Sequence, residues 1–290
     1  MSWRGWAAFA ALGIIWGLPY FFIKVAVQDV PPFVIAFCRI ALAALILLPI
    51  AARRGALRGI AGHKWALFSF AMVEFAIPFS LITIGERWIA SSVTGILIAM
   101  VPMSTALMQP LFGIHEKLGA LRLAGMVLGF LGVATLVGTG PIHGALAWVG
   151  VGCMLVATLG YAVGPLIIQR HMSEIDSYGA LAASLAVAAA LLLMPALLQW
   201  PARMPSAASV GSIALLGVVC TSAAMLLMFY LVHHAGATRA TLITYINPVI
   251  ATLLGVLLLH ENLGLSGLVA FVMILAGCWL ATRGRHAART

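Results

Sequence analysis

The sequence His-Glu-Lys-Leu-Gly at residues 115–119 recurs, with one change, as His-Glu-Asn-Leu-Gly at residues 260–264, which is 145 residues further along the chain. Each copy follows an apolar stretch that contains a proline, Pro102 in the first case and Pro248 in the second. Each copy also precedes an apolar stretch that contains glycines. A common offset indicates an internal duplication, and a duplication of this size sets the architecture before any single element does.

Apolar stretches that are long enough to cross a membrane surround both copies. A helix needs about 20 apolar residues to cross roughly 30 Å of hydrocarbon. Ten stretches of about that length are present, with short polar or Pro/Gly-containing breaks between them. They run over residues 5–25, 33–51, 65–84, 89–112, 120–138, 145–167, 178–199, 209–232, 237–259 and 264–282. The sequence therefore predicts an all-α integral membrane protein with ten transmembrane helices.

The composition agrees with this prediction and excludes most soluble functions. Of the 290 residues, 63% are hydrophobic and 8% are charged, whereas soluble domains average about 45–50% apolar and about 25% charged residues. A soluble protein of this size cannot bury so much apolar surface. A soluble enzyme, a nucleic-acid-binding domain and a disordered chain are therefore not expected. The four cysteines lie inside apolar stretches without a CxxC pair, so we expect no disulfide framework, metal site or cofactor.

The positions of lysine and arginine predict the orientation of the spans, because cytoplasmic connections carry an excess of these residues. With the N-terminus inside, twelve of them lie in inner segments, three lie in outer segments, and Arg39 lies within the second span. The inner residues are Arg4, Arg53, Arg54, Arg58, Lys64, Lys117, Arg122, Arg170, Arg239, Arg283, Arg285 and Arg289, and the outer residues are Lys24, Arg87 and Arg203. This imbalance predicts that both termini are cytoplasmic.

The duplication divides the chain into two halves of five spans, residues 1–140 and residues 141–290. The same offset pairs Trp16 in the first span with Tyr161 in the sixth. Since five is an odd number, the second half enters the membrane inverted relative to the first. Inverted repeats are a recurring design of secondary transporters, in which one half rocks against the other around a site near the midplane. We therefore expect a 5+5 inverted-repeat bundle and a transport function.

Several features follow one another in a characteristic order along the chain. They are Trp16-Gly17 in the first span, Arg39 in the second, Pro102 in the fourth, Glu116 before the glycine-rich fifth, and Pro248 and Glu261 in the second half. In these features the whole chain resembles the EamA-type members of the drug/metabolite transporter (DMT) superfamily, and within them it is similar to the YddG type of amino-acid exporter. It departs from a full duplication at Ser184, where the offset from Arg39 falls.

The resemblance implies a bacterial inner-membrane exporter of amino acids, other metabolites or cationic drugs. It also implies a central cavity between spans 1–4 and 6–9, with spans 5 and 10 at the periphery. The expected partners are a small-molecule substrate and the lipid bilayer, with protons as a further candidate and no nucleic acid. The expected assembly is a monomer or weak oligomer.

Glu74 is the most informative residue for function. It follows Lys64 by ten residues, which places it about 15 Å into the membrane at 1.5 Å per residue. A carboxyl at mid-depth is costly and usually faces a cavity or a partner. Glu74 therefore either carries a proton, binds a substrate ammonium, or is a protonated structural residue.

Other polar and aromatic side chains fall at depths that suit a cavity wall. Interior aromatic rings can stack on a substrate, and hydroxyl and amide groups can hydrogen-bond to it; ordinary helix packing is the alternative for each of them. The predicted wall consists of Trp16, Glu74, Phe75, Pro78, Phe79, Tyr161, Thr221, Ser222, Met225, Tyr245 and Asn247. The prolines inside spans are predicted hinges or kinks, and these are Pro19, Pro102, Pro165 and Pro248.

The remaining ionisable residues of the spans lie nearer their ends. For Lys24 we expect a side chain that reaches the lipid headgroups, and for Arg39 a paired side chain, for which a backbone carbonyl is a candidate partner. Either residue could instead attract a carboxylate at the mouth of a cavity. Glu116 and Glu261 are expected to terminate helices and anchor them at the interface.

The preferred function is export of neutral or aromatic amino acids and related metabolites by alternating access, either downhill or by exchange with protons through Glu74. Efflux of cationic or amphipathic drugs, with Glu74 as the counter-charge, is the alternative. A membrane-embedded enzyme would need paired catalytic groups at one depth, but the eight histidines lie at span ends or in connections. A channel would need a ring of polar residues, which the spans do not suggest.

Overall fold

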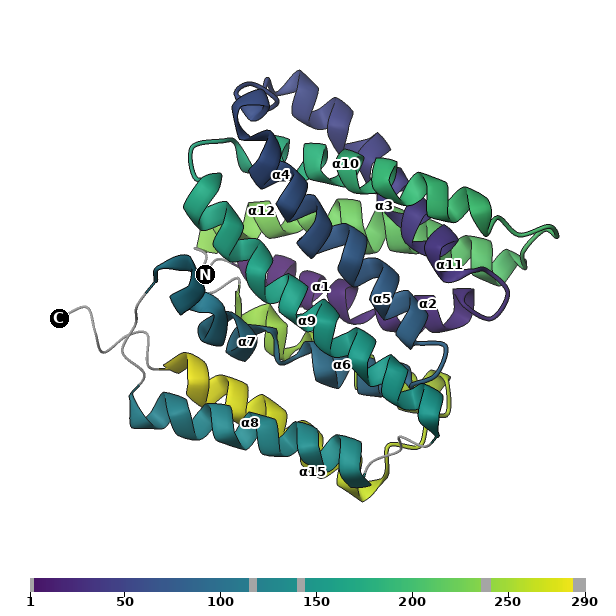
Figure 1. Ribbon diagram of the computed structural model, residues 1–290, viewed down its shortest axis with the longest axis vertical. Helices are drawn as coiled ribbons and strands as arrows, with labels where there is room; N and C mark the ends of the chain where they lie inside the picture. Colours follow the sequence, from purple (N-terminus) through teal and green to yellow (C-terminus); the bar gives the residue numbers. More distant parts are fainter. Residues whose placement is uncertain (1–2, 115–118, 140–143, 236–240, 284–290) are drawn as a thin grey trace.

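The computed structural model describes residues 3–114, 119–139, 144–235 and 241–283. Every regular element in these ranges is a helix, and they contain no strand. The first residue of this part of the chain and the last lie at the same end of the bundle (Figure 1). The prediction of an all-α fold is confirmed.

The described helices reproduce the predicted spans closely. The first half contains α1 (Trp3–Gly17), α2 (Pro19–Ala26), α3 (Pro32–Arg53), η1 (Ile60–His63), α4 (Lys64–Phe70), η2 (Ala71–Ala76), α5 (Ile77–Gly85), α6 (Ser91–Ile98), α7 (Val101–Met108), η3 (Gln109–Phe112) and α8 (Ala120–Thr139). The second half contains α9 (Ala145–His171), α10 (Ser177–Leu198), α11 (Ala207–Gly217), η4 (Val218–Ala223), α12 (Ala224–Ala235), η5 (Thr241–Tyr245), α14 (Asn247–Leu258) and α15 (Gly264–Arg283).

Nine of these continuous helical stretches, counted over the described residues, are long and apolar enough to cross a membrane. The ninth predicted span, residues 237–259, differs from the others. Its described residues, 241–259, contain a shorter apolar helix, Ile243–Leu258, and residues 236–240 lie outside the described ranges.

Proline and π-helical turns interrupt several spans near their middle. Proline lacks a backbone N–H, so it fits best in the first turn of a helix. Pro19, Pro102 and Pro248 stand in this position, at the starts of α2, α7 and α14. Pro165 lies inside the continuous helix α9. The third and eighth spans contain the π-helical turns η2 and η4, and in the third span Pro78 follows in the first turn of α5. Such π turns are frequent at functional sites.

Each span packs on at least one span of the other half, and five of these pairings illustrate the pattern (Figure 1). Span 1 packs on span 8 (α1 on α12, α2 on α11), span 2 on span 7 (α3 on α10), span 3 on span 6 (α5 on α9), span 4 on span 9 (α6 on α14) and span 5 on span 10 (α8 on α15). When both spans of any pair are replaced by the equivalent spans of the other half, five places away in the chain, the result is again one of the five pairs. The packing therefore has the pattern that two related halves of five spans would produce.

Glycines allow the closest of these contacts. On α15, a Cβ built at Gly277 would lie 2.5 Å from the backbone nitrogen of Gly129 and 2.6 Å from the carbonyl oxygen of Gly125 on α8. The glycine pair at positions 13 and 17 of α1 lies against the side chains of Ile246 and Ile250, at the start of α14. Small residues at these positions let helix backbones meet, as they do in membrane helix pairs generally.

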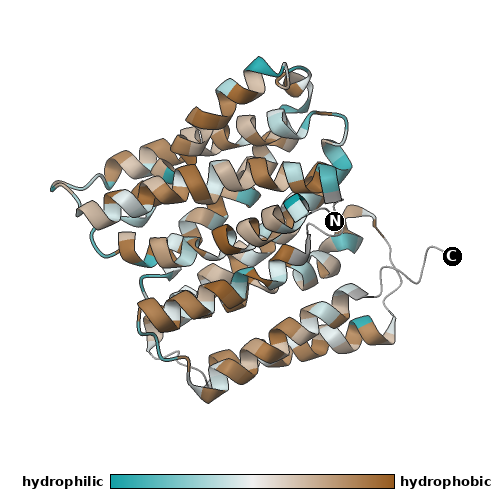
Figure 2. Ribbon diagram, turned by 180° about the vertical axis from the view of Figure 1, so that it is seen from behind, coloured by the Kyte–Doolittle hydropathy of each residue, from teal (hydrophilic) through white to brown (hydrophobic). Residues whose placement is uncertain are grey.

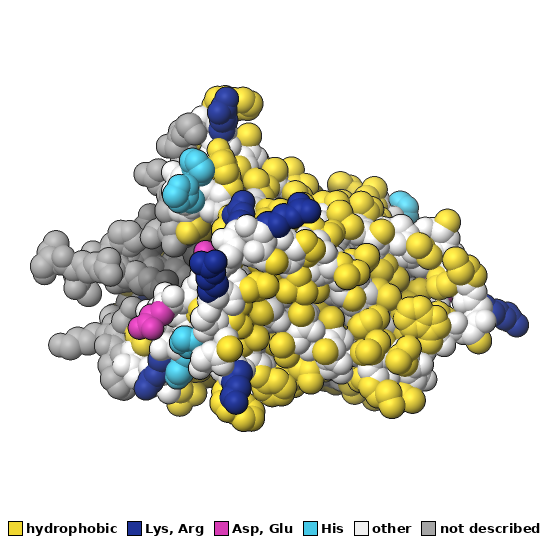
Figure 3. Space-filling view, turned by 90° about the horizontal axis from the view of Figure 1, so that it is seen from above, with side chains coloured by type: hydrophobic (Ala, Val, Ile, Leu, Met, Phe, Trp, Pro, Cys, Tyr) yellow, Lys and Arg dark blue, Asp and Glu magenta, His cyan; other side chains and the backbone are white. Residues whose placement is uncertain are grey.

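The surface has the polarity of a membrane protein. Hydrophobic residues dominate the helices, and hydrophilic residues gather at helix ends and connections (Figure 2). On the face seen in Figure 3, most Lys, Arg and His side chains lie towards one end of the molecule and hydrophobic side chains cover the middle. Such a belt suits hydrocarbon, and the uneven distribution of cations resembles that of proteins with basic cytoplasmic connections.

Candidate substrate cavity

A cavity of about 640 Å³ lies between the spans of both halves. Its walls come from spans 1–4 and 6–9, and none of its described lining residues belongs to α8 or α15. Met172, Ile175 and Ser177, at the connection of α9 with α10, carry the lining to the end of the bundle where α1 begins (Figure 1). The cavity therefore extends from the middle of the bundle towards that end.

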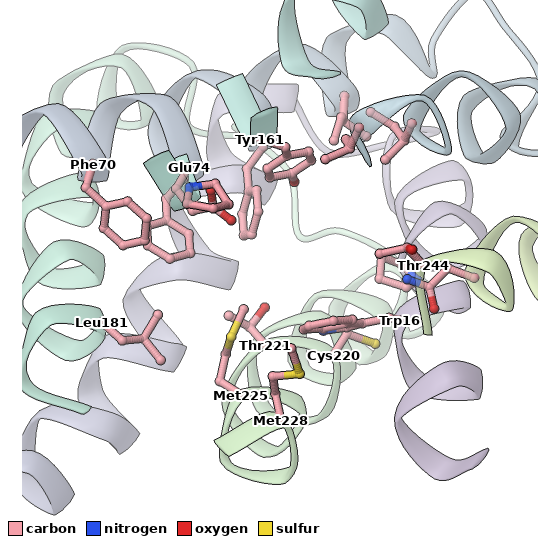
Figure 4. Close-up of a pocket in the computed structure, with 18 of the residues that line it drawn as sticks. Trp16, Phe70, Glu74, Tyr161, Leu181, Cys220, Thr221, Met225, Met228 and Thr244 are labelled. Carbon is pink, nitrogen blue, oxygen red and sulfur yellow. The ribbon is translucent and has the colours of Figure 1, made fainter. Parts of the chain in front are cut away.

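Most of the predicted wall residues line this cavity. Figure 4 shows Trp16, Glu74 and Tyr161 around a common space, with Thr221 and Met225 across from Glu74. The full set of predicted wall residues that line it is Trp16, Glu74, Phe75, Phe79, Tyr161, Thr221, Met225 and Asn247, and the four prolines Pro19, Pro102, Pro165 and Pro248 line it as well. Their roles in binding and in bending stay predictions.

Glu74 lies in the π turn η2, opposite a glycine of α9. A Cβ built at Gly164 would collide with Oε2 of Glu74, so only glycine leaves room for the carboxyl in this position. Oε2 is buried and accepts no hydrogen bond from the described residues. Phe75 forms edge-to-face contacts with Phe70 and Phe79, at 5.6 and 5.8 Å between ring centroids. An aromatic wall thus surrounds a carboxyl that has no protein donor at Oε2.

The π turn η4 provides the polar side chains of the eighth span. Thr221 donates to the carbonyl of Leu216 at 2.8 Å, and Ser222 donates to the carbonyl of Gly217 at 2.8 Å. Both bonds reach five residues back, which is the spacing of a π turn. The hydroxyls therefore satisfy carbonyls that the widened turn displaces.

Three predicted wall residues do not line the cavity. Pro78 packs against α9, where a Cβ at Gly160 would lie 3.0 Å from its Cγ. Ser222 is buried, and its hydroxyl donates to the carbonyl of Gly217. The phenol of Tyr245 bonds to Thr282 of α15 at 2.7 Å and points away from the centre of the bundle. Depth in the membrane was a sound criterion for all three, but each occupies a face of its helix that meets a neighbouring helix.

Asn247 links α14 to α1 as well as lining the cavity. With the amide oriented by its hydrogen bonds, its nitrogen donates to the carbonyls of Ile243 at 3.1 Å and Gly13 at 3.2 Å. The bond to Ile243 satisfies a carbonyl close to the helix break before Pro248.

The cavity also contains residues that the sequence analysis did not place there. Arg39 is the most important, and Tyr20, Met228 and Phe229 also line the wall. Arg39 donates from Nε to Oγ1 of Thr221 at 3.0 Å, rather than to a backbone carbonyl, and its guanidinium lies 3.8 Å from the centroid of the Phe79 ring. The sequence contained a signal for this position, since an arginine about six residues inside a span is rare and usually faces a cavity or a partner.

The opposite end of the bundle is closed by polar contacts between spans. Lys24 donates to the carbonyls of Glu86 at 2.6 Å and Ile89 at 2.8 Å, so the prediction that it reaches the lipid headgroups is wrong. The carboxylate of Glu261 accepts from the backbone N–H groups of Ser91 at 2.7 Å and Ser92 at 2.9 Å. Glu261 therefore caps the first turn of α6, a helix of another span, and this contact was not predicted. Glu116 lies outside the described residues.

Asp29 adds a further contact at this end, between the first two spans and the start of the eighth. Its carboxylate accepts from the backbone N–H of Ser206 at 2.7 Å and from the hydroxyl of Ser209. The hydrogen bond from Ser209, and then that from Ser206, lower the pKa of Asp29 below its ordinary value of 3.8. The carboxylate is thus held in its charged form at neutral pH.

Comparison with known proteins gives consistent results over the length of the chain. The profile of the EamA-like transporter family matches twice, at residues 3–138 and 148–283. The chain is 28% identical to the uncharacterised inner membrane transporter YedA of Escherichia coli, over 96% of this chain and 90% of that protein. It is 24% identical to an uncharacterised transporter of Archaeoglobus fulgidus, over 97% and 100% of the two chains, and 24% identical to the uncharacterised transporter YvbV of Bacillus subtilis, over 95% and 91%. A crystal structure with 17% identity superposes with a TM-score of 0.67 over 96% of both chains, which shows a shared fold.

Proposed function

Because the chain belongs to the EamA-like transporter family of membrane transporters, we propose that it exports neutral or aromatic amino acids and related small metabolites across the bacterial inner membrane. It is a multi-pass membrane transporter and not an enzyme. The observation that carries the proposal is the central cavity of about 640 Å³, with an aromatic wall and a buried carboxyl. Sites for small molecules have volumes of about 300–1,000 Å³ and combine apolar walls with a few polar groups.

The architecture that we propose is a 5+5 inverted repeat, with residues 1–140 and 141–290 as its halves. The five span pairs, which are preserved when each span is exchanged for the one five places away, support this arrangement. The two separate matches of the family profile support it too. The excess of lysine and arginine at one end supports cytoplasmic termini. A monomer or weak oligomer stays the prediction for the assembly.

The asymmetry of the cavity supports the proposal of alternating access. Its lining reaches the end where α1 begins, while contacts of Lys24 and Glu261 close the other end. With cytoplasmic termini, this is an inward-facing form. Export then requires a second form in which the outer contacts separate while the inner end closes.

Glu74 is the residue that we propose for proton linkage. It is the carboxyl in the lining of the cavity, and a buried carboxyl exchanges its proton when access to water changes. Its unsatisfied Oε2 also favours the second candidate function, which is efflux of organic cations with Glu74 as the counter-charge.

Transport into liposomes tests both functions. Purified protein is reconstituted and assayed with a panel of neutral and aromatic L-amino acids and with tetraphenylphosphonium, with and without a pH gradient. We expect amino-acid transport, and we expect Glu74→Gln to abolish its pH-driven component while the fold is retained. Glu174→Gln, at an exposed carboxyl outside the cavity, is the matched control. Transport of tetraphenylphosphonium alone would replace the first function by the second, and an unchanged pH dependence in Glu74→Gln would refute the proton role.

A further inference from the structure

Arg39 is the cation of the cavity. It is 7% exposed, and among the described residues that line the cavity it is the one with a positively charged side chain. A guanidinium keeps its charge at any accessible pH, so this charge is permanent. A permanent buried charge needs a partner, because removal from water costs several kcal/mol unless an opposite charge or hydrogen bonds compensate.

The surrounding protein holds the guanidinium in place but uses little of its hydrogen-bonding capacity. Nε donates to Oγ1 of Thr221 at 3.0 Å, and Thr221 is itself oriented because its hydroxyl donates to Leu216. The ring of Phe79 covers one face of the guanidinium plane at 3.8 Å. These two contacts orient the side chain through Nε and one face of the guanidinium. They do not involve the edge that carries the two terminal amino groups.

That edge has no partner among the described residues. The terminal amino groups of Arg39 make no hydrogen bond to them, and no ion pair joins Arg39 to a described carboxylate. Glu86 acts on the charge only from a distance, together with the phenols of Tyr20 and Tyr161 and the thiol of Cys220. The charge is therefore buried in the cavity wall, oriented, and not neutralised by contact with the protein.

We propose that Arg39 is the carboxylate-binding residue of the cavity and that the transported molecule must carry a free carboxylate. The inference rests on the proposed transport function and deepens it, because it names the group that the substrate presents. The edge of a guanidinium matches a planar carboxylate with two parallel hydrogen bonds, which adds direction as well as energy. An amide or an organic cation offers no such match, and a cation is repelled by the same charge.

The test compares molecules that differ only in the group Arg39 would recognise. In liposomes, competition against labelled L-phenylalanine and L-methionine is measured for the unlabelled amino acids, for their carboxamides and for 3-phenylpropionate, which keeps the carboxylate and lacks the ammonium. We expect the carboxamides to compete about tenfold more weakly or worse, in line with the strength of hydrogen bonds between charged groups. We expect 3-phenylpropionate to compete better than the carboxamides.

Variants connect the preference to the residue. Arg39→Gln should remove the preference for acid over carboxamide, and Arg39→Lys should keep part of it, since it retains the charge without the planar edge. Arg87→Gln removes an exposed positive charge from a helix end that does not line the cavity, and it should leave the preference unchanged. Thermal stabilisation of the unaltered protein by L-phenylalanine but not by its carboxamide tests the same point without a variant.

Equal competition by acid and carboxamide in the unaltered protein, or an intact preference in Arg39→Gln, would overturn the role of Arg39 and leave amino-acid transport standing. Absence of amino-acid transport, with tetraphenylphosphonium moved instead, would overturn the proposed function itself. The two failures therefore give different results.

Discussion

Replacement of Lys24 by Met should open the closed end of the bundle. The ammonium of Lys24, at the end of α2, donates to the carbonyls of Glu86 and Ile89 in the connection between α5 and α6. Met fills a similar volume without these bonds. Under the proposed alternating mechanism, Lys24 makes these two hydrogen bonds only in the form in which this end is closed. The substitution by Met therefore destabilises the closed form and leaves the open form unchanged.

The size of the effect follows from the two bonds. A hydrogen bond to a charged group contributes about 1.5–3 kcal/mol, and because Lys24 is only partly buried the lower value applies, which gives about 3 kcal/mol for the pair. Since about 1.4 kcal/mol is a tenfold change in an equilibrium constant, the ratio of closed to open molecules should fall roughly 150-fold. A protein that was about 99% closed would become about 40% closed.

A cysteine reporter measures this shift. Ile98→Cys places a thiol in the cavity lining, in a background in which the four native cysteines are replaced. An impermeant maleimide is added from the side opposite the termini, and labelling is compared with Lys24 and with Met at position 24. We expect a strong increase with Met and little change with Lys24→Arg, which keeps the charge. Equal labelling of a folded Lys24→Met protein would refute the reasoning.

Two further substitutions test local packing and charge. Gly164→Ala should lower the melting temperature in detergent, because its Cβ collides with Glu74 and overpacking typically costs about 1–3 kcal/mol. Gly152→Ala, in open space on the same helix, should leave the melting temperature unchanged. An equal loss in both variants would show that the collision with Glu74 is not the cause. The pKa of Asp29 is lowered in the folded protein from its ordinary value of 3.8. Its stabilising contribution is therefore present above that ordinary value and is lost as the pH falls through the lower folded value. Asp29→Asn should therefore make stability depend less on pH between the folded and the ordinary pKa of Asp29. Superimposable acid-unfolding curves for the two proteins would show that the hydrogen bonds from Ser206 and Ser209 do not contribute to stability.

The fold and the depth of the candidate site were predictable because both depend on local patterns. Apolar length determines where a helix can cross the bilayer. Glu74 and Thr221 could be assigned to the middle of their spans by counting residues from the ends. The cavity then contains both, since a carboxyl and a hydroxyl at mid-depth avoid the lipid.

The orientation of side chains around each helix was not predictable in the same way. Ser222 follows Thr221 directly, and only the π turn decides which of the two faces the cavity. Tyr245 finds its partner at Thr282, on a span that the pattern of its own helix does not reveal. Lys24 looked like an interfacial lysine because its acceptors are carbonyls at the end of another span, and backbone carbonyls leave no mark in a sequence.

The two π turns carry a mechanical consequence. Each holds one residue more than an α-helical turn, so passing that residue to the adjoining turn would rotate the residues in between by about 100° around the helix axis, while the rest of the helix keeps its orientation. Glu74 sits in one turn and Thr221 in the other. A single shift of this kind would rotate Glu74 or Thr221 from the cavity towards a neighbouring helix without unwinding the span. Each half therefore contains a turn that can reorient a polar side chain of the cavity.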